Sequence, residues 1–438
     1  MRGGSIMKTS AVVIAFFIIL HCPSVKAQEE GGHVTDNTPT KINGFYIDFN
    51  YRDLEPIAIG KGDFSLEIGG HVILDAIKYG HANERSSGLE FDYATLIILG
   101  HFKSFSWRIE PDLLGRNTPS NIYDVWGSLA ICPELHLTAG QFRVALGSEY
   151  ATQEEDLPFA GYGFTSYLAG RYDVGFRIDG DLLKRMLRYQ ATATLGKGFD
   201  PEGNRLESPL YALRLVGHPF GWIKDNAGFW SFLQGFFSGV SIAHTTNFDD
   251  PVMLANPFES RVFRTRDLDG DSGQWIHYEF GYHRGPFRLA YEHVSGTADD
   301  VPIGRGEKED MDQLTSWVVY ASWNITGEKQ VWKSGGWVKP AEASSGGSGF
   351  FDFLPGRWEI GARYSNADID RDLFVYNYTF YGQSTQEVRT FSLNLNWQPR
   401  DKVRFSVQWV KTIADQDLAT FGDTDRDSSF LLRFALLL

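Results

Sequence analysis

Two stretches of the chain decide its fold: RWEIGARYS (Arg357 to Ser365) and TFSLNLNWQPRDKVRFSVQWVK (Thr390 to Lys411). In both, an apolar residue occupies every second position. These residues are Trp358, Ile360, Ala362 and Tyr364, then Phe391, Leu393, Leu395 and Trp397, and, after a short turn, Val403, Phe405, Val407 and Trp409. Side chains of a strand alternate between faces, so the pattern predicts three strands with one apolar and one polar face each. Aromatic residues near the ends of such stripes are typical of a transmembrane β-barrel wall, although a soluble β-sandwich alternates in the same way.

The same alternation continues through most of the chain. Thirteen further strands are predicted near residues 64–76, 91–99, 105–109, 123–131, 135–139, 172–178, 187–195, 211–215, 236–243, 276–282, 287–291, 317–325 and 430–438. The total of about 16 is even, which closure of a bacterial single-chain barrel favours. The sequence therefore predicts an all-β fold, a single antiparallel transmembrane β-barrel.

The lengths of the connections give a second test of this prediction. Outer-membrane barrels have short periplasmic turns and long external loops. If the chain starts on the periplasmic side, the connections near residues 100–104, 132–134, 182–186, 284–286 and 398–401 are periplasmic, and all are short. The external ones are long: residues 146–170, 196–208, 246–273, 295–313, 366–387 and 412–428. Residues 217–233 and 327–356 are long periplasmic connections and break the rule.

The N-terminus has the pattern of a secretory signal peptide. Arg2 and Lys8 precede an apolar run over residues 11–20, and Val25-Lys26-Ala27 suits cleavage before Gln28. Beyond it, no run of 18 apolar residues could form a transmembrane helix. We therefore divide the chain into a signal peptide (residues 1–27), an N-terminal periplasmic lead (28–60) and a barrel domain (61–438).

Composition and motifs exclude several classes of function. The chain has 41 Lys and Arg against 55 Asp and Glu, a net charge of −14, which becomes −17 when Arg2, Lys8 and Lys26 leave with the signal. This acidic balance argues against nucleic acid as a partner. Two cysteines provide no disulfide framework and no Cys-based metal site. The motifs of lipases, zinc proteases and P-loop enzymes are absent. We predict no enzymatic activity, no cofactor and no metal.

Six segments, in the right order, resemble the phosphate-selective porin O and P family. They are GDFSLEIGGHVILDA (62–76), ELHLTAGQFRVALGSE (134–149), RYDVGFRIDG (171–180), SWVVYASWNITGE (316–328), RWEIGARYSNADID (357–370) and LNLNWQPRDKVRFSVQWV (393–410). The second resembles the family's Gly-Gln-Phe-Lys-x-Pro-Phe segment, with Arg143 in place of Lys and Ala145 in place of Pro.

The resemblance implies a homotrimer of sixteen-stranded barrels in the outer membrane of a Gram-negative bacterium, in contact with lipid and lipopolysaccharide. It also implies that the third external loop, here residues 146–170, folds into the lumen, and that basic residues there pass phosphate or other anions. The acidic run from Glu149 to Asp156 contains no Lys or Arg, which departs from this expectation.

The polar faces of the predicted strands place ten basic residues in the lumen as pore-lining candidates. They are Arg108, Arg171, Arg177, Arg188, Arg214, Arg288, Arg363, Lys402, Arg404 and Arg433. Arg presents a fixed charge and a planar donor fork that suits phosphate oxygens. However, Asp and Glu on the same faces could pair with these residues and make them structural.

These observations lead to one functional prediction with two alternatives. We expect an outer-membrane porin that forms a water-filled channel for passive diffusion of small hydrophilic solutes, in particular anions such as phosphate. The acidic balance favours a general or cation-preferring porin instead. A secreted soluble β-protein is the remote alternative.

Overall fold

The computed structural model describes residues 40–42, 45–48, 56–81, 86–115, 122–153, 156–196, 208–223, 228–248, 252–333, 336–341, 354–380 and 382–438. The predicted signal peptide (residues 1–27) lies outside these ranges, so the division into domains remains a prediction. Among the described residues, no helix has the length and hydropathy needed to cross a membrane.

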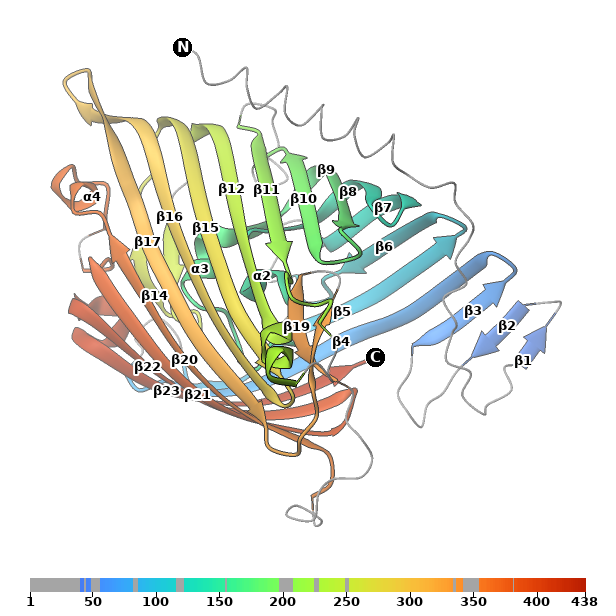
Figure 1. Cartoon of the computed structure of the whole chain (residues 1–438). Helices are drawn as coiled ribbons and strands as arrows, with labels where there is room; N and C mark the ends of the chain where they lie inside the picture. The colour runs from blue at the N-terminus through green and yellow to red at the C-terminus, as the bar shows by residue number, and fades with distance from the viewer. Residues whose placement is uncertain are drawn as a thin grey trace.

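Sixteen antiparallel strands form a closed barrel, as the alternation predicted (Figure 1). They are β4 (Phe64–Lys78), β5 (Gly88–Phe102), β6 (Phe105–Pro111), β7 (Ile122–Cys132), β8 (Leu135–Ala145), β9 (Gly170–Leu182), β10 (Leu187–Thr194), β11 (Leu210–Gly217), β12 (Phe236–Phe248), β15 (Gly270–Arg284), β16 (Phe287–Gly304), β17 (Glu307–Asn324), β20 (Arg357–Ile369), β21 (Glu387–Arg400), β22 (Val403–Leu418) and β23 (Thr424–Leu437). Each strand pairs with the next in the chain.

The barrel closes between its first and last strands. β23 pairs with β4 from Phe430 opposite Lys78 to Leu437 opposite His71. On the inner side of this seam, the Arg433 guanidinium donates to Asp75 at 2.7 Å and 2.8 Å and to Asp92 at 2.6 Å. The ion pairs therefore join the closing strand to both β4 and β5.

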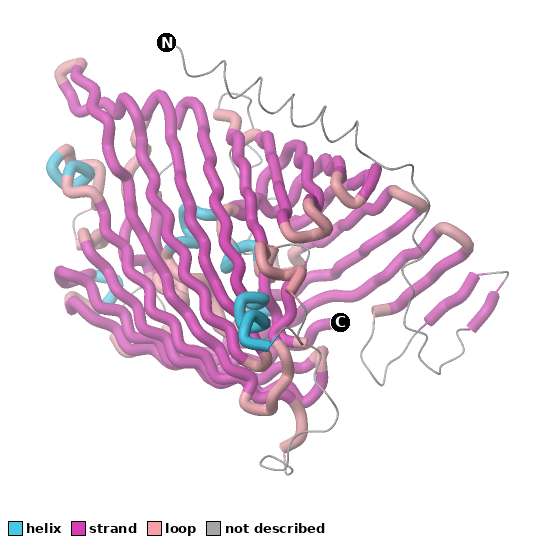
Figure 2. Tube along the Cα trace, in the orientation of Figure 1, coloured by secondary structure: helices cyan, strands magenta, loops and turns pink. Residues whose placement is uncertain are grey.

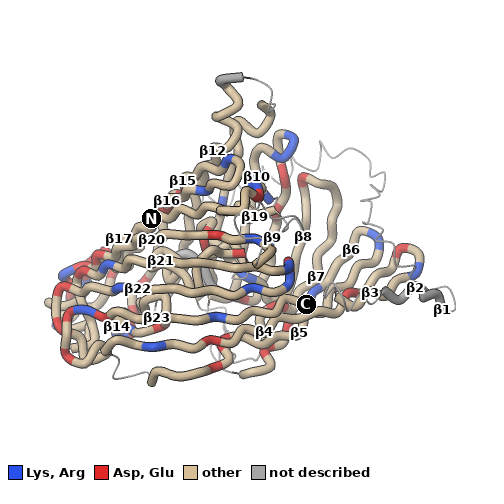
Figure 3. Tube along the Cα trace, turned by 90° about the horizontal axis from the view of Figure 1, so that it is seen from below, with Lys and Arg blue, Asp and Glu red and all other residues tan. Residues whose placement is uncertain are grey.

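The outer surface of the wall is apolar. Phe280, Trp323, Ile360, Val407 and Leu432 are all between 45% and 59% exposed, which a water-soluble sheet would not tolerate in one continuous band. Acidic and basic residues alternate with uncharged ones along several wall strands, with both signs mixed (Figure 3). The pattern is that of a barrel with an outer surface for lipid and a polar interior.

Register shifts in β5 and β7 change the predicted alternation. In β5 the register shifts so that Phe91 lies opposite Leu74 but Tyr93 lies opposite Ile73, which leaves Asp92 as an extra residue. An extra residue moves the following side chains to the other face. Tyr93, Ile97 and Leu99 continue the apolar alternation from Phe91, which predicts the outer face, but after the extra residue they lie on the lumen side.

A second shift occurs in β7. Glu110 lies opposite Asp124 but Pro111 opposite Ile122, so Tyr123 is the extra residue. Tyr123 was predicted on the outer face, but it is only 7% exposed and packs against Tyr93 and Tyr172, with ring centroids at 4.9 Å and 5.5 Å.

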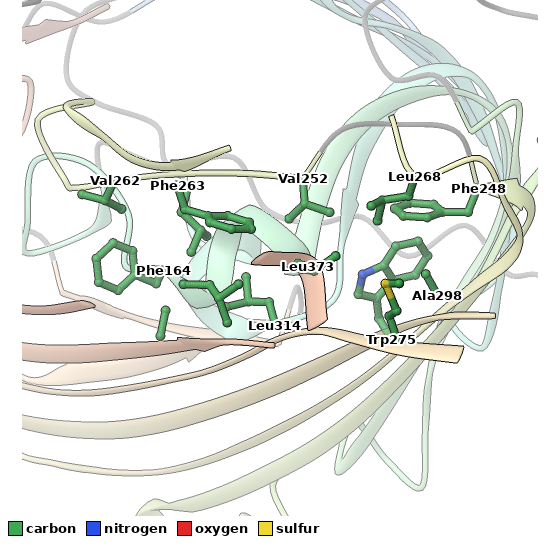
Figure 4. Close-up of a cluster of buried hydrophobic side chains, with 14 of the residues drawn as sticks. Phe164, Phe248, Val252, Val262, Phe263, Leu268, Trp275, Ala298, Leu314 and Leu373 are labelled. Atoms are coloured by element: carbon green, nitrogen blue, oxygen red, sulfur yellow. The ribbon is translucent and has the colours of Figure 1, made fainter. Parts of the chain in front are cut away.

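The external end of the barrel contains a hydrophobic core (Figure 4). Two predicted external loops, residues 295–313 and 412–428, are largely strand, because β16, β17, β22 and β23 extend beyond the membrane-facing wall. Along β16 the polarity of the faces inverts there: Arg288 and Glu292 point inward lower down, whereas Val294 and Ala298 are the buried residues higher up. The prediction of loops in these two segments was wrong, because the strand pattern used for the wall has its apolar residues on the outer face.

Other loops contribute to the same core. The hairpin β13 (Met253–Ala255) and β14 (Arg261–Arg264) brings in Leu254 and Phe263, both 0% exposed. The short helix α4 (Asp372–Val375) brings in Leu373, and the 3-10 turn η3 (Ala419–Phe421) brings in Phe421. These loop segments therefore pack into the core at the external end, whereas the β16–β17 hairpin projects from it at the upper left of Figure 2.

The periplasmic end has elements that the sequence did not predict. Within the predicted lead, β1 (Thr40–Ile42), β2 (Phe45–Asp48) and β3 (Ile57–Lys61) form a small meander on the lower half of β4. Of the two long periplasmic connections, one carries the 3-10 helix η2 (Gly228–Gly235). The other forms the hairpin β18 (Gln330–Lys333) and β19 (Trp337–Pro340).

Candidate functional site

The third loop, residues 146–169 between β8 and β9, folds into the lumen, as the resemblance implied. It carries two short helices, α2 (Ser148–Ala151) and α3 (Thr165–Ala169), inside the barrel (Figure 1). A buried ion pair holds it: Arg363 on β20 donates to Glu149 at 2.8 Å, with both side chains at most 1% exposed. Glu149 also accepts from the Gly163 backbone N–H and the Ser166 hydroxyl, so it joins both halves of the loop to the wall.

A second set of contacts fixes the start of the loop. Glu292 on β16 accepts from the Ser148 hydroxyl and the Glu149 backbone N–H, each at 2.6 Å. His277 on β15 contacts Glu292 at 3.2 Å with one ring nitrogen and the Leu146 carbonyl at 2.6 Å with the other. Through these contacts Glu292 and His277 anchor the start of the third loop to the barrel wall.

The middle of the loop lies against the wall formed by β20 to β22. The Pro158 carbonyl accepts from the side-chain amides of Asn394 and Asn396. Gln408 hydrogen-bonds both the N–H and the carbonyl of Ala160, at 2.7 Å and 3.1 Å. The loop therefore crosses the lumen and closes its far side, which leaves open space along the opposite wall.

That space is a cavity of about 370 Å³ between the third loop and strands β4 to β11. Its charged lining residues are Arg108, Arg143, Arg177, Arg188 and Arg214 against Glu110 and Asp124. Four of the five arginines were predicted pore-lining candidates. The side chains that line this cavity therefore carry more positive than negative charge.

Arg143 is the lining arginine that the list of candidates missed. Its guanidinium donates to the Tyr172 hydroxyl at 2.9 Å and 3.1 Å and to the Tyr162 hydroxyl at 3.2 Å. It also donates to the Tyr150 and Thr152 carbonyls of the third loop. Among the described residues its hydrogen-bond partners are all uncharged, so neutral oxygens hold it in place and no carboxylate forms a direct ion pair with it.

The other lining arginines have carboxylate partners. Arg108 contacts Glu110 at 2.6 Å and Asp124 at 3.4 Å. Arg177 and Arg188 both contact Asp179, and Arg188 also contacts Asp181 at 3.1 Å. Arg214 contacts Glu279 at 2.8 Å. Arg363 and Arg433, also predicted candidates, form the buried pairs with Glu149 and with Asp75 and Asp92 described above.

The remaining candidates lie in different settings. Arg288 donates to the Tyr320 hydroxyl at 2.6 Å and to the Val338 carbonyl at 2.7 Å, and Arg404 donates to the Leu157 carbonyl at 2.9 Å. Lys402 lies in the turn between β21 and β22, so it belongs to the periplasmic rim and not to the wall. Arg171 lies on β9, but its side chain is outside the described part of the structure.

The periplasmic hairpin β18–β19 enters the lumen from below. Val338 is 0% exposed and packs with Phe159 of the third loop and with Tyr320 on β17. Arg214 donates to the Gly336 carbonyl, and Lys339 contacts Asp156 of the third loop at 3.3 Å. We call residues 330–340 the lumen hairpin.

The lumen hairpin is also held from below by an aromatic contact. Its Trp332 lies parallel to the ring of His218, with centroids 5.2 Å apart. Burial lowers the pKa of His218, so at neutral pH this imidazole is uncharged and suited to stacking.

Local backbone irregularities in β5 and β8 explain why Tyr93 and Arg143 were not predicted at the cavity. Gly140 on β8 has φ +129°, where a Cβ would lie 2.2 Å from the Val125 carbonyl oxygen. Beyond it, the neighbours Phe142 and Arg143 both line the cavity, so alternation no longer identifies the inner residues. A Gly inside a predicted strand signals such irregularities, and Gly140 was visible in the sequence.

Comparisons with known proteins agree with the predicted family. The family model described as "Phosphate-selective porin O and P" matches residues 259–434. A comparison with curated protein sequences finds no match. The outer membrane channel DcaP of Acinetobacter baumannii has a similar solved structure, with a TM-score of 0.53 and 12% identity over 86% of this chain and 99% of that one.

A loop deletion mutant of OmpT, an outer membrane protein of Vibrio cholerae, gives a TM-score of 0.52 at 8% identity, over 86% of this chain and all of that one. Sequence identities this low support the barrel fold but do not indicate a substrate. Over residues 259–434 the chain is therefore similar to the phosphate-selective porin O and P family, and its closed barrel of 16 strands has the fold of these outer membrane proteins.

Proposed function

We propose that the protein is a passive outer-membrane porin for small hydrophilic solutes, with a preference for anions such as phosphate. The observation that carries the anion preference is the cavity beside the third loop, whose lining has five arginines against two carboxylates. Arg143 contributes most, because its described partners are neutral oxygens of Tyr and backbone groups.

The arrangement suits the passage of an anion and not its tight binding. Four lining arginines share their charge with carboxylates, so each offers an anion only a weak site. An ion that meets several weak sites in series can enter and also leave. The planar guanidinium groups can accept phosphate oxygens in pairs as the ion passes.

A general or cation-preferring porin is the second candidate. The acidic balance of the chain favours it, since Asp and Glu exceed Lys and Arg by 14. The ion pairs of Arg108, Arg177, Arg188 and Arg214 also reduce the positive field that a passing ion experiences. The two proposals differ in the sign of one measurable quantity.

That quantity is the zero-current potential of the purified protein in a planar bilayer under a KCl gradient. We expect the sign of an anion-selective channel, and we expect added phosphate to reduce the chloride current. A potential of the opposite sign would instead support the cation-preferring porin. Absence of any channel activity would contradict both proposals.

The lumen hairpin gives a further expected result. Val338→Asp places a carboxylate among the buried apolar side chains of Phe159 and Tyr320, which costs several kcal/mol unless the hairpin leaves the lumen. We therefore expect an increased single-channel conductance, matched by a variant in which residues 330–340 are replaced with a short Gly-Ser linker.

Val375→Asp is the control for Val338→Asp, because Val375 is 60% exposed at the external end. It should conduct like the unmodified protein. An unchanged conductance in both hairpin variants would show that the hairpin does not limit the passage.

We further propose assembly as a homotrimer within outer-membrane lipid and lipopolysaccharide, after cleavage of the signal near Ala27. The trimer is supported by the family and by the similar solved structure of OmpT, which is described as a trimer form. Cross-linking of membranes should give three-chain species, and N-terminal sequencing of the mature protein should begin near Gln28. Only monomers after cross-linking would contradict the trimer.

A further inference from the structure

The cavity beside the third loop has an aromatic side as well as a cationic one. Tyr93, Trp126, Phe142 and Tyr172 line it together with the arginines. An inorganic anion would interact with the guanidinium groups alone and would gain nothing from flat apolar rings. The combination therefore suits a solute that has both an anionic group and a flat ring. This inference rests on the proposed function, because it concerns the same cavity.

The size of the cavity also exceeds what an inorganic oxyanion requires. Its volume is about 370 Å³. Sites for small organic ligands have volumes of about 300–1,000 Å³, and a single water occupies about 30 Å³ in the liquid. The space is therefore sufficient for a ring that carries an anionic group.

Three of the four aromatic rings already have partners within the protein. The guanidinium of Arg177 lies 4.9 Å from the centre of Phe142, and that of Arg143 lies 5.1 Å from the centre of Tyr172. Tyr93 packs against Tyr123. The fourth ring of the cavity lining is that of Trp126.

Trp126 is half-buried and packs at one edge of the external hydrophobic core. Its neighbour on β8 is Gly140, which has no side chain to cover it. The indole face is thus the surface of this cavity best suited to stack with a solute.

We propose that the cavity selects organic anions that consist of a planar ring with a phosphate or carboxylate group. The ring stacks on Trp126, and the anionic group is received by Arg143 and the neighbouring lining arginines. One solute then gains binding free energy from two interactions: stacking of its aromatic ring, and pairing of its oxyanion with guanidinium groups. Inorganic phosphate uses only the second interaction.

The test compares anions of equal charge and different shape. In planar bilayers with KCl, the current is titrated with inorganic phosphate, cyclohexyl phosphate and phenyl phosphate, at a pH where all are dianions. We expect phenyl phosphate to reduce the current at a concentration about two- to twelvefold lower than cyclohexyl phosphate, the range expected for one aromatic stacking contact. Benzoate against cyclohexanecarboxylate repeats the comparison with the carboxylate group.

Trp126→Leu identifies the residue responsible. This variant keeps an apolar side chain but removes the flat ring, so the preference for phenyl over cyclohexyl phosphate should disappear while the effect of inorganic phosphate remains. Trp323→Leu is the matched control, since Trp323 is 50% exposed on the outer surface, and it should retain the preference.

The outcomes separate this inference from the proposed function. Equal potency of phenyl and cyclohexyl phosphate in the unmodified protein, or a preference that survives in Trp126→Leu, would overturn the inference alone. In either case a reduction of current by inorganic phosphate would leave the anion porin standing. Loss of the preference in Trp126→Leu alone would support the inference.

Discussion

Replacing Glu149 with Ala is expected to release the third loop from the barrel wall. The substitution leaves Arg363 buried at 0% side-chain exposure without its carboxylate. Breaking a buried ion pair by removing one partner costs about 3–5 kcal/mol, and we expect a loss of this size in the free energy of unfolding. The loop that narrows the lumen would be less firmly held, so single-channel conductance should rise and ion selectivity should weaken.

Two further variants show whether the buried charge is the cause. In Glu149→Gln combined with Arg363→Met, neither charge is buried, so most of the stability should return, as replacement of buried pairs by apolar groups is often neutral. Asp271→Asn breaks the exposed pair with Lys308, whose members are 60% and 44% exposed, and should leave stability and conductance unchanged. If Glu149→Ala conducts and unfolds like the unmodified protein, the ion pair does not anchor the loop.

Arg143→Glu is expected to reverse the ion selectivity. The substitution replaces the lining arginine whose described partners are neutral with a carboxylate, so the local charge changes by two units within the narrowed passage. Coulomb interactions near a protein surface amount to about 4 kcal/mol for unit charges 4 Å apart, enough to favour cations. The zero-current potential under a KCl gradient should therefore change sign.

Milder variants separate charge from geometry. Arg143→Gln should raise the phosphate concentration needed to reduce the current by about 10- to 100-fold, the effect of losing one charged hydrogen-bonding group worth about 1.5–3 kcal/mol. Arg143→Lys keeps the charge but not the planar fork, so it should keep anion selectivity and lose part of the phosphate effect. Arg426→Gln at the exposed external rim is the control. Unchanged selectivity in Arg143→Glu would remove Arg143 from the ion path.

The barrel could be predicted from the sequence because its wall obeys one rule over long stretches. Every second residue of a strand such as β21 meets lipid, and the intervening ones meet the lumen, so Phe391 and Leu393 reveal the strand and its orientation. The same rule placed Arg108, Arg188 and Arg214 on the inner face, where they line the cavity. The connection lengths added an independent check, since most of them alternate between short and long.

The rest of the site depends on contacts that alternation does not encode. Extra residues at Asp92 and Tyr123 move tyrosines into the lumen, and a single shift of this kind inverts all the side chains that follow. Whether an inward arginine is balanced depends on the three-dimensional position of carboxylates: Arg363 pairs with Glu149, which lies 214 residues away. No local pattern predicts such a pair.

The inverted polarity at the external end was a further source of error. Where β16 and β17 rise above the membrane, buried Ala298 and Met311 face a core formed by loops, and the outer face is polar. A prediction based on apolar residues at the outer face misses these segments, because their apolar residues face inward. The lumen hairpin was missed for a similar reason, because its apolar residue Val338 faces the lumen and not lipid.

The seam between β4 and β23 has a consequence for how the chain reaches its native state. Arg433 and Asp75 meet across 358 residues, so this contact forms only after nearly the whole chain has been synthesised. Loop-closure entropy for a chain of this length opposes the step by about 5 kcal/mol, and contacts of such long range fold slowly. Until then both strands expose unpaired edges, which are prone to join other chains. The intermediate therefore needs protection from aggregation, and closure of this one seam marks the moment when that need ends.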